Sequence, residues 1–317
     1  MRALPCRERG TALAMALLVI TLLTGLTLGF SEDSVIELDL AGYWRDEQRA
    51  YRLAASAVHV GLSLLDLDRE NEADTLKEDW SRFEGRLGGD EEEEGMTLSG
   101  RVTDENAKFP LHLLVTSEGV PDETREKQLQ RLFLHLGLKE TLAGPLMDWL
   151  DHDSDERPEG AEEPYYRTLE EPYSCANGPF QTIGQVFLVK GIKDVEQFGV
   201  GLERRLLDYL TISSDGRINL NTAPPEILMS LSEGMDVPMV EAIVEYRQNQ
   251  DFEKVEDLLK IPGMEESLFE EIKGLLTVKA TAFCLEFTGR CQGAQSRVKA
   301  LAVREKDRMV LTYWQVR

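Results

Sequence analysis

The sequence is poor in cysteine, in histidine and in positive charge. Four cysteines in 317 residues are too few to build a disulfide scaffold. Lysine and arginine total 35 against 58 aspartates and glutamates, which gives a formal net charge of −23. Because such a surface repels phosphate backbones, the composition argues against nucleic-acid binding. Hydrophobic residues make up 42% of the chain, enough to bury a core, and the length fits about two domains.

Catalytic motifs are also missing. The sequence contains no G-x-S-x-G, no P-loop and no G-x-G-x-x-G. Asp151 and Asp153 alternate as paired acids do, but nothing nearby supplies a nucleophile or an oxyanion site. The four histidines lack metal-ligand spacing and occur singly, at His59, His112, His135 and His152. We therefore predict that the protein is not an enzyme.

Residues 11–30 carry no charge. Twenty helical residues span about 30 Å, the thickness of the hydrocarbon core of a bilayer. Three arginines stand in residues 1–10, whereas four acids stand in residues 31–40. The positive-inside rule therefore places residues 1–10 in the cytoplasm and the rest of the chain outside.

Three kinds of N-terminal segment compete for this pattern. A secretory signal peptide would be cut after the apolar run, where only residues 27–29 resemble a small-x-small site. A plain signal anchor would stay uncut. A third kind is cut before the apolar run, after Gly10, and keeps that run as its anchor. The third kind predicts a basic leader ending in glycine and an apolar helix that continues beyond the membrane, as this sequence has.

The helical pattern continues past residue 30. Apolar residues from Val35 to Leu65 recur at three-to-four spacing, and no proline occurs between Pro5 and Pro110. A membrane helix that runs into an amphipathic helix of similar length is the shape of a pilin-like subunit.

The leader ending in Arg9-Gly10 and the helix after it resemble the class III signal of type IV pilins and type II secretion pseudopilins. Two positions depart from that family: Thr11 stands where Phe or Met is usual, and Met15 stands where most members have Glu. That Glu neutralises the N-terminal ammonium of a neighbouring subunit, since a lone charge in lipid costs several kcal/mol. A subunit without it suits the tip of the assembly, and K-type minor pseudopilins typically lack it.

The middle of the chain alternates polar loops with short helices. Residues 66–100 are polar and include a solvated acidic loop at residues 88–95, followed by a predicted strand at residues 96–103. Apolar stripes predict helices at residues 122–137 and 142–150.

An acidic stretch follows, in which Asp151, Asp153 and Asp155 alternate and further acids come seven to eight residues later. Ca²⁺ takes six to eight oxygen ligands from such loops. The stretch is not an EF-hand, because Glu156 stands where that loop needs glycine. The spacing alone leaves both a calcium site and a solvated acidic loop open.

The motifs DWLD at 148–151, GAE at 160–162, YY at 165–166 and ANG at 176–178 are similar to the segment that characterises K-type pseudopilins. The large helical domain of that family binds calcium there. The resemblance implies a Ca²⁺ site with Asp151, Asp153 and Glu162 as ligands and with Asp148, Asp155 and Glu163 as further candidates. His152 is expected to have a surface role.

Residues 217–276 predict a helix-hairpin-helix-like unit. Asn221 or Thr222 is expected to cap a helix that begins at Pro224 and Pro225, and a second helix is expected at residues 237–248. The hairpins EGMD (233–236) and IPGME (261–265) lack paired glycines and lie among acids. We therefore expect a structural module rather than a DNA-binding one.

Alternation of period two begins at Leu276. It predicts strands at residues 277–288, 297–303 and 309–316, with turns at 289–296 and 305–307. The predicted fold class is α+β: a pilin-like long N-terminal helix on a small antiparallel sheet, with a large inserted all-helical domain of helix-hairpin-helix or SAM-like type.

Cleavage after Gly10 would remove Cys6 and leave three cysteines. In one extended strand Cys284 and Cys291 would be about 23 Å apart and could not bond. A turn at residues 289–290 would allow a disulfide between them. Small buried thiols are the alternative.

The resemblance implies a K-type minor pseudopilin that initiates or caps the type II secretion pseudopilus and supports protein export. It also implies cleavage by prepilin peptidase, methylation of Thr11, partnership with I- and J-type minor pseudopilins, other pseudopilins and the inner-membrane platform, and an inner-membrane location with the globular part in the periplasm. The alternatives are a minor type IV pilus subunit and a single-pass periplasmic calcium-binding protein. The expected segments are a leader (1–10), a transmembrane helix (11–30), its periplasmic continuation (31–66), a sheet (67–105 and 277–317) and the inserted domain (106–276), with the calcium-binding loop near 148–178.

Overall fold

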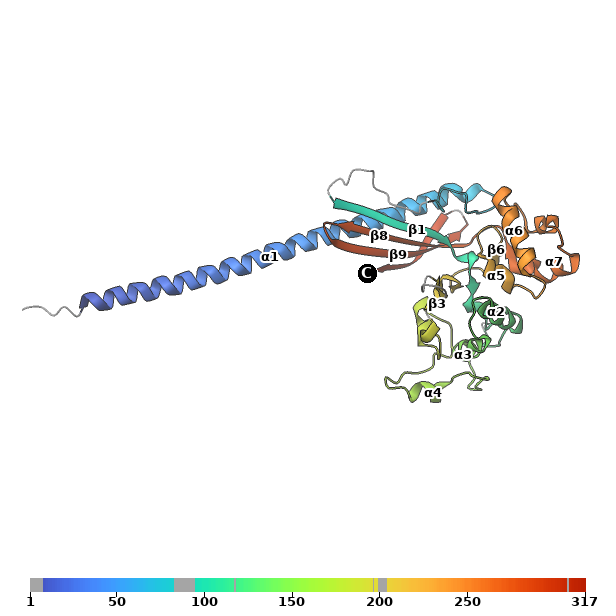
Figure 1. Cartoon of the computed structure of the whole chain (residues 1–317), viewed down its shortest axis with the longest axis horizontal. Coiled ribbons are helices and arrows are strands. Elements are labelled where there is room, and N and C mark those ends of the chain that lie inside the picture. Colours follow the sequence, from blue (N-terminus) through green and yellow to red (C-terminus); the bar gives the residue numbers. More distant parts are fainter. Residues whose placement is uncertain (1–7, 83–94, 117, 196, 199–203, 307) are drawn as a thin grey trace, which may run out of the picture.

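A computed structural model describes residues 8–82, 95–116, 118–195, 197–198, 204–306 and 308–317. One very long helix carries a four-stranded sheet on its C-terminal part, and a helical domain lies at the far end of that sheet (Figure 1). Residues 1–7 of the predicted leader and most of the predicted acidic loop at 88–95 lie outside the described residues.

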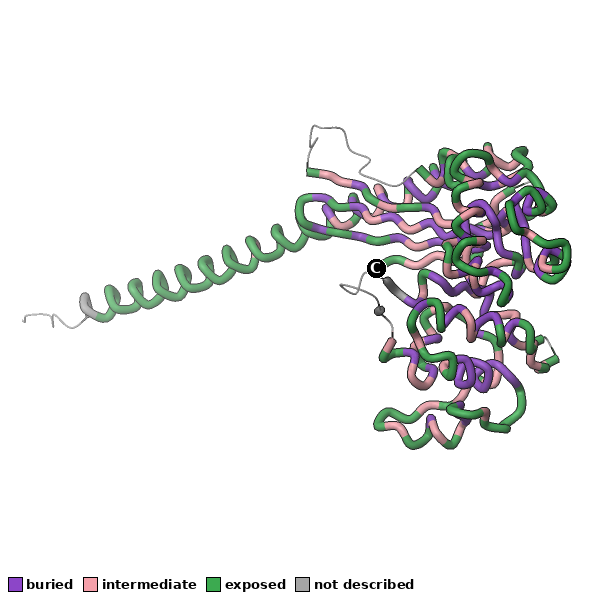
Figure 2. The backbone as a smooth tube through the Cα atoms, turned by 45° about the vertical axis from the view of Figure 1, so that its right-hand side comes forward, coloured by how far each residue is buried: buried purple, intermediate pink, exposed green. Residues whose placement is uncertain are grey.

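Helix α1 runs from Glu8 to Leu67, 60 residues or about 90 Å at 1.5 Å per residue. An 18-residue window near its start has a mean hydropathy of 2.3, with none of its residues buried by the rest of the chain. In Figure 2 this half of the helix is exposed along its length, and burial begins where the sheet covers it. From Ala50 onward one face is buried against the sheet, including Ala54, Val58 and Leu65.

The sheet has the order β1-β8-β9-β10, and its neighbouring strands are antiparallel. Its strands are β1 (Met96–Asp104), β8 (Ala282–Cys291), β9 (Ala294–Glu305) and β10 (Arg308–Val316). Alternate side chains turn toward α1 and form one core with it, among them Val102, Leu285 and Val298. Trp80 closes this core, edge-on to Phe283 at a ring distance of 5.1 Å.

Close approach of α1 and β8 depends on Gly289. A Cβ atom at this position would lie 2.2 Å from the carbonyl oxygen of Ala50. Only glycine therefore lets the helix backbone settle onto the strand here.

The predicted C-terminal strands are confirmed as elements, but two boundaries are wrong. Residues 278–281 are not in a strand, because this crossing segment is held by Asp74, which binds Val278 and Ala280 through the backbone and the side chain. The predicted turn at 289–296 is only Gln292-Gly293, whose φ angles of 48° and 90° suit a two-residue hairpin turn.

The prediction of a possible disulfide between Cys284 and Cys291 is wrong. Both thiols are free and lie seven residues apart along the extended strand β8. Cys284 pairs in register with Leu301, whereas Cys291 pairs with Ala294 beside the turn, so no bend brings the two sulfurs together.

The helical domain has its own core, which includes Phe109, Phe133, Trp149, Ile227 and Phe252. Its α-helices are α2 (Glu123–His135), α3 (Ala143–Leu150), α4 (Glu163–Arg167), α5 (Pro225–Ser230), α6 (Val237–Asn249) and α7 (Glu266–Ile272).

Short strand pairs join β2 (Phe109–Pro110) to β5 (Leu210–Thr211), β3 (Gln197–Phe198) to β4 (Arg204–Arg205) and β6 (Ile218–Asn219) to β7 (Leu276–Thr277). The described 3₁₀ segments are η1 (Asp68–Glu70), η3 (Glu105–Ala107), η4 (Leu111–Leu113), η5 (Glu140–Leu142), η6 (Ile183–Leu188), η7 (Lys193–Val195), η9 (Leu206–Asp208), η10 (Val255–Lys260) and η11 (Lys273–Leu275).

The predicted helices at 122–137, 142–150 and 237–248 correspond to α2, α3 and α6. Asp122 caps α2 by accepting from the backbone N–H groups of Thr124 and Arg125. The expected cap of α5 is wrong, since Pro224 is its N-cap and no side chain caps it.

The two residues expected to cap α5 bind elsewhere. The hydroxyl of Thr222 donates to Asp104 at 2.6 Å, and Asn221 exchanges two hydrogen bonds with the backbone of Phe252. Both residues therefore hold distant parts of the chain together.

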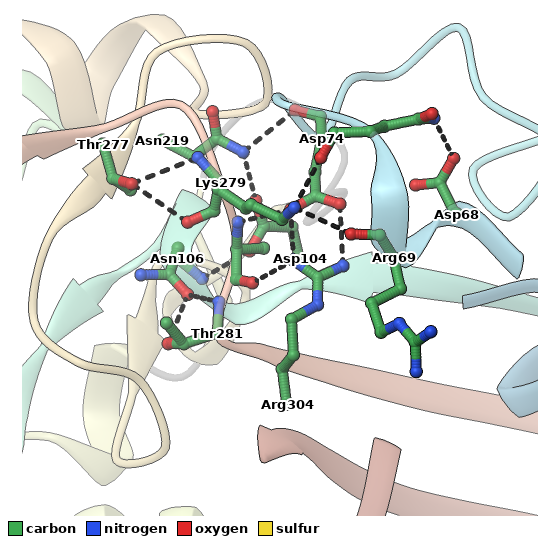
Figure 3. A network of polar contacts seen from close by, with 12 residues as sticks. Asp68, Arg69, Asp74, Asp104, Asn106, Asn219, Thr277, Lys279, Thr281 and Arg304 are labelled. Carbon is green, nitrogen blue, oxygen red and sulfur yellow. Dashed lines mark hydrogen bonds and ion pairs between the residues drawn. The ribbon is translucent and has the colours of Figure 1, made fainter. Parts of the chain in front are cut away.

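A buried polar network joins the sheet to the helical domain (Figure 3). Arg304 of β9 binds both carboxylate oxygens of Asp74, at 2.8 and 2.9 Å. Asp104 at the end of β1 accepts from Asn219 of β6 at 2.9 Å and from the backbone of Asn106 at 2.6 Å. The network thus connects the segment after α1, two strands of the sheet and the core of the helical domain.

Burial raises the pKa of Asp104 to about 7, although its hydrogen bonds with Thr222 and Asn219 favour the charged form and oppose the shift. An unfolded aspartate has a pKa of about 3.9. Between these values the folded protein binds the extra proton, so this group contributes stability that falls as pH rises from about 4 to about 7.

We expect Asp104→Asn to flatten the pH dependence of stability. The unfolding free energy of the wild type should fall more steeply than that of the variant between pH 5 and 6.5, by up to about 1.4 kcal/mol per pH unit. Denaturant titrations of the detergent-solubilised chain measure the two slopes. The exposed control Asp79→Asn should run parallel to the wild type, and parallel curves for Asp104→Asn would contradict the assignment.

Candidate metal centre

The acidic stretch forms a loop between α3 and α4. Every residue of α3, from Ala143 to Leu150, is buried, so the helix is fixed in the core and its C-terminal end delivers Asp151 to a set position. The chain then turns through residues 152–161 and returns at Glu162, the N-cap of α4.

Three carboxylates converge in this loop. Asp151, Asp153 and Glu162 each present an oxygen, and these oxygens all lie within 4.8 Å of one another. Asp151 and Glu162 are buried, whereas Asp153 is exposed and gives the site a side open to solvent. These are the three residues that the resemblance singled out as ligands, and the structure brings them together.

Several oxygens at this place have no hydrogen-bond donor. Oδ1 of Asp151 and both carboxylate oxygens of Glu162 are buried without a partner in the described part of the chain. Buried polar atoms without partners are unfavourable, and a hard cation with oxygen ligands would satisfy all three. The donor set therefore fits Ca²⁺.

The negative charges of the carboxylates in this loop repel one another. Burial, followed by the charges of Asp148 and Asp151, raises the pKa of Glu162 to about 7. Burial also raises the pKa of Asp151, although the guanidinium of Arg157 opposes the shift. A bound cation would offset this repulsion, so the arrangement can hold a divalent ion.

Asp148, a further candidate ligand, has a structural role in the loop. Its carboxylate accepts from the backbone of Arg157 and Ala161, at 3.2 and 2.9 Å, and from the Arg157 guanidinium at 3.1 Å. A Cβ at Gly160 would lie 1.9 Å from Oδ2 of Asp148, so the returning chain passes directly over this carboxylate. Arg157 also donates to the second oxygen of Asp151 at 2.5 Å.

The other two candidates do not join the cluster. Asp155 is exposed, and its backbone N–H donates to Asp153 at 2.8 Å. Glu163 accepts from Arg167 at 2.6 Å and from the backbone of Cys175 at 2.7 Å. His152 is exposed, as expected.

Sequence reasoning missed Asn177 as a candidate ligand. Its side-chain amide donates to the carbonyl of Asp153 at 2.9 Å, while its own Oδ1 is buried and has no hydrogen-bond partner within the described ranges. Amide oxygens are ordinary Ca²⁺ ligands. Asn177 adopts a φ of 41°, which asparagine tolerates better than most residues. The ANG motif was the only local signal in the sequence for a ligand at this position.

Aromatic rings hold the segments around the loop together. Trp149 lies edge-on to Tyr166 at a ring distance of 5.1 Å and stacks on Phe180 at 6.4 Å. The backbone N–H of Gly178 donates to the carbonyl of Trp149, which brings residues 176–178 next to the end of α3.

The long bare helix, the sheet packed on it and the inserted helical domain define a pilin-like subunit with an enlarged head. A family model described as type II secretion system protein K matches residues 107–197, and a helix-hairpin-helix model matches residues 213–277.

Relatives match over nearly the whole chain. A type II secretion system protein K of Klebsiella pneumoniae is 25% identical over 300 residues, 89% of this chain and 88% of the relative. One of Aeromonas hydrophila is 23% identical over 322 residues, 95% of this chain and 94% of the relative.

A solved structure shares the fold. In the crystal structure of the GspK-GspI-GspJ complex from enterotoxigenic Escherichia coli, the matching chain superposes with a TM-score of 0.69 at 20% identity, covering 86% of this chain and 97% of that one. The family model, the relatives and the solved structure together support a K-type minor pseudopilin of the type II secretion system.

Proposed function

We propose that this subunit occupies the tip of the type II secretion pseudopilus, where it initiates or caps assembly with I- and J-type minor pseudopilins and supports protein export. The observation that carries the proposal is the position of the helical domain. It lies at the end of the sheet away from the bare half of α1 and extends well beyond the width of helix and sheet (Figure 1). A closely packed shaft has no room for such a head, whereas the tip does.

The exposed face of α1 supports assembly with other stalked subunits. Between the predicted membrane span and the sheet, α1 leaves large apolar side chains uncovered, including Ile36, Leu38 and Trp44, which are 65%, 72% and 60% exposed. Apolar residues on a helix outside the membrane usually pack on another helix. Neighbouring subunits of similar build would cover this stretch.

Met15 agrees with a tip position. A subunit in the shaft needs a carboxylate here to neutralise the terminal ammonium of a neighbour within lipid. Met15 is 71% exposed in α1 and offers no charge. The first subunit of a filament has no such pairing to make.

The N-terminal segment supports a single-pass subunit of the inner membrane whose globular part is periplasmic. Prepilin peptidase would cut after Gly10, leaving Thr11 as the methylated first residue of a helix that is already formed at this position. The membrane-embedded half of α1 then anchors the subunit before assembly, where it would meet other pseudopilins and the secretion platform.

Within the helical domain we propose a Ca²⁺ ion held by Asp151, Asp153 and Glu162, with Asn177 as a further oxygen ligand. When bound, the ion supplies positive charge that cross-links the end of α3 to the start of α4. Arg157 and Asp148 keep the loop in place around it. Its role is therefore to stiffen the head and not to catalyse a reaction.

The mature chain extracted from membranes should begin at Thr11. Intact-mass and N-terminal peptide mass spectrometry measure this directly. An intact Met1, or a start beyond Phe30, would contradict the pseudopilin processing.

Trp44→Glu should prevent assembly without unfolding the subunit, because this side chain is 60% exposed and is not among the residues of either described core. We expect at least a tenfold loss of the I- and J-type subunits that co-purify with the detergent-solubilised chain, at an unchanged melting temperature. Arg52→Glu on an exposed position of the same helix is the control.

The tip position itself is tested by gold labelling an epitope inserted at the exposed residues Glu170 and Glu171. Label should mark a single end of each pseudopilus, whereas the same epitope on the major pseudopilin should mark the whole shaft. Label along the shaft from this subunit would exclude the tip.

Calcium should raise the melting temperature of the solubilised chain relative to EDTA. At a free concentration of about a hundred times the dissociation constant, binding adds about 2.7 kcal/mol, or roughly 5–10 °C for a domain of this size. Asp151→Ala combined with Asp153→Ala should abolish the shift, whereas Asp155→Ala should keep it. An undiminished shift in the double variant would rule out the ligand set.

A further inference from the structure

A groove of about 780 Å³ lies between the sheet and the helical domain, and Asp151, Asp153 and Glu162 are not part of its lining. Its floor is the face of the sheet turned away from α1, and its wall comes from residues 180–184 and 210–213 of the helical domain. In Figure 1 strand β3 lies below the sheet, near the C-terminus. We call this feature the sheet–domain groove.

The floor is built by the alternation of the strands. Side chains that do not face α1 line up across the sheet in register, so that Arg101, Glu286, Lys299 and Gln315 form one row over β1, β8, β9 and β10. The adjacent row is less polar and consists of Thr103, Cys284, Leu301 and Tyr313. The floor is therefore a charged row beside a largely apolar row.

The lining of the groove is basic in an acidic protein. Five cations line it against three acids, whereas the whole chain has a formal net charge of −23. The cations are Arg101, Lys108, Arg297, Lys299 and Arg317, and the acids are Glu105, Asp208 and Glu286.

Most of this positive charge is available to a ligand. Arg101 lies 3.7 Å from Asp208, and Arg297 lies 3.8 Å from Glu286, so both are long ion pairs between partly exposed side chains. Lys299 forms no ion pair with any residue that the structure describes, and only Lys108 is tightly paired, at 2.6 Å from Glu105. Exposed pairs of such length contribute little stability and can be exchanged for a ligand carboxylate.

The charges and shape together select the kind of occupant. A nucleic acid would meet the repulsion of a strongly acidic protein on its approach, whereas a short acidic segment carries few charges and is drawn to the local cations. Ile183, Phe187 and Tyr313 offer apolar surface beside the cations, which suits side chains that alternate along an extended chain.

We propose that the sheet–domain groove binds an extended acidic segment of a partner polypeptide, with its carboxylates against Lys299 and its neighbouring cations and its apolar side chains against Leu301 and Tyr313. This binding does not depend on the tip position or on the calcium site, so each can fail without the others.

The test is a selection of random twelve-residue peptides displayed on phage against the full chain in detergent at 50 mM NaCl. Enriched peptides should be rich in Asp and Glu. One of them, synthesised with a fluorescent label, should bind the wild type saturably and should bind Lys299→Glu at least tenfold more weakly. Its affinity for Lys127→Glu should equal that for the wild type, because this exposed lysine of α2 lies outside the groove and the substitution changes the net charge by the same amount.

Three results would overturn the proposal. No enrichment, or enrichment of peptides without acidic residues, would show that the groove does not select this chemistry. Equal weakening in Lys299→Glu and Lys127→Glu would show that only net charge matters. Displacement of the peptide by a twelve-nucleotide single-stranded DNA at equal concentration would assign the groove to nucleic acid. The melting temperature of each variant confirms that the fold is intact.

Discussion

The buried polar network around Asp74 and Asp104 is the constraint on which the arrangement of the two cores depends. Asp74 follows α1 and binds Arg304 near the end of β9, and the carboxylate of Asp74 also accepts from the backbone N–H of Ala280. Removing either side chain of the Arg304–Asp74 ion pair would leave the other charge buried without its partner, at a cost of several kcal/mol in unfolding free energy. Asn219 of the helical domain donates to the carbonyl of Asp74 and to the carboxylate of Asp104, so the position of that domain follows from this network.

Much of the fold could be predicted from the sequence because periodicity is a local signal. The stripe of period 3.6 in α2 and the alternation in β9 each reflect one buried face and needed no knowledge of distant residues. Asn221 and Thr222 could not be placed, since their partners Phe252 and Asp104 are 31 and 118 residues away. A polar residue before a helix resembles a cap whether it binds nearby or far away.

The candidate metal centre shows the same limit. Sequence similarity pointed to six acids, and the structure divides them by what already satisfies each carboxylate. Asp148 is saturated by the returning loop and Glu163 by Arg167, whereas neither carboxylate oxygen of Glu162 has a hydrogen-bond partner among the described residues. Asn177 comes from a separate segment, and no spacing rule connects it to Asp151. The ligand oxygens converge because the core around Trp149 folds these segments together. The order of the residues along the chain does not reveal this convergence.

The helical domain leaves the pilin part of the chain after Asp104 and returns before Ala282, and Asp104 pairs in register with Phe283. Its entrance and exit are therefore neighbouring strands, about 5 Å apart. A tight hairpin would connect the same two strands equally well. The head can thus be enlarged, exchanged or lost in evolution while β1 and β8 keep their pairing, so subunits with a common stalk can differ freely in what they display above it.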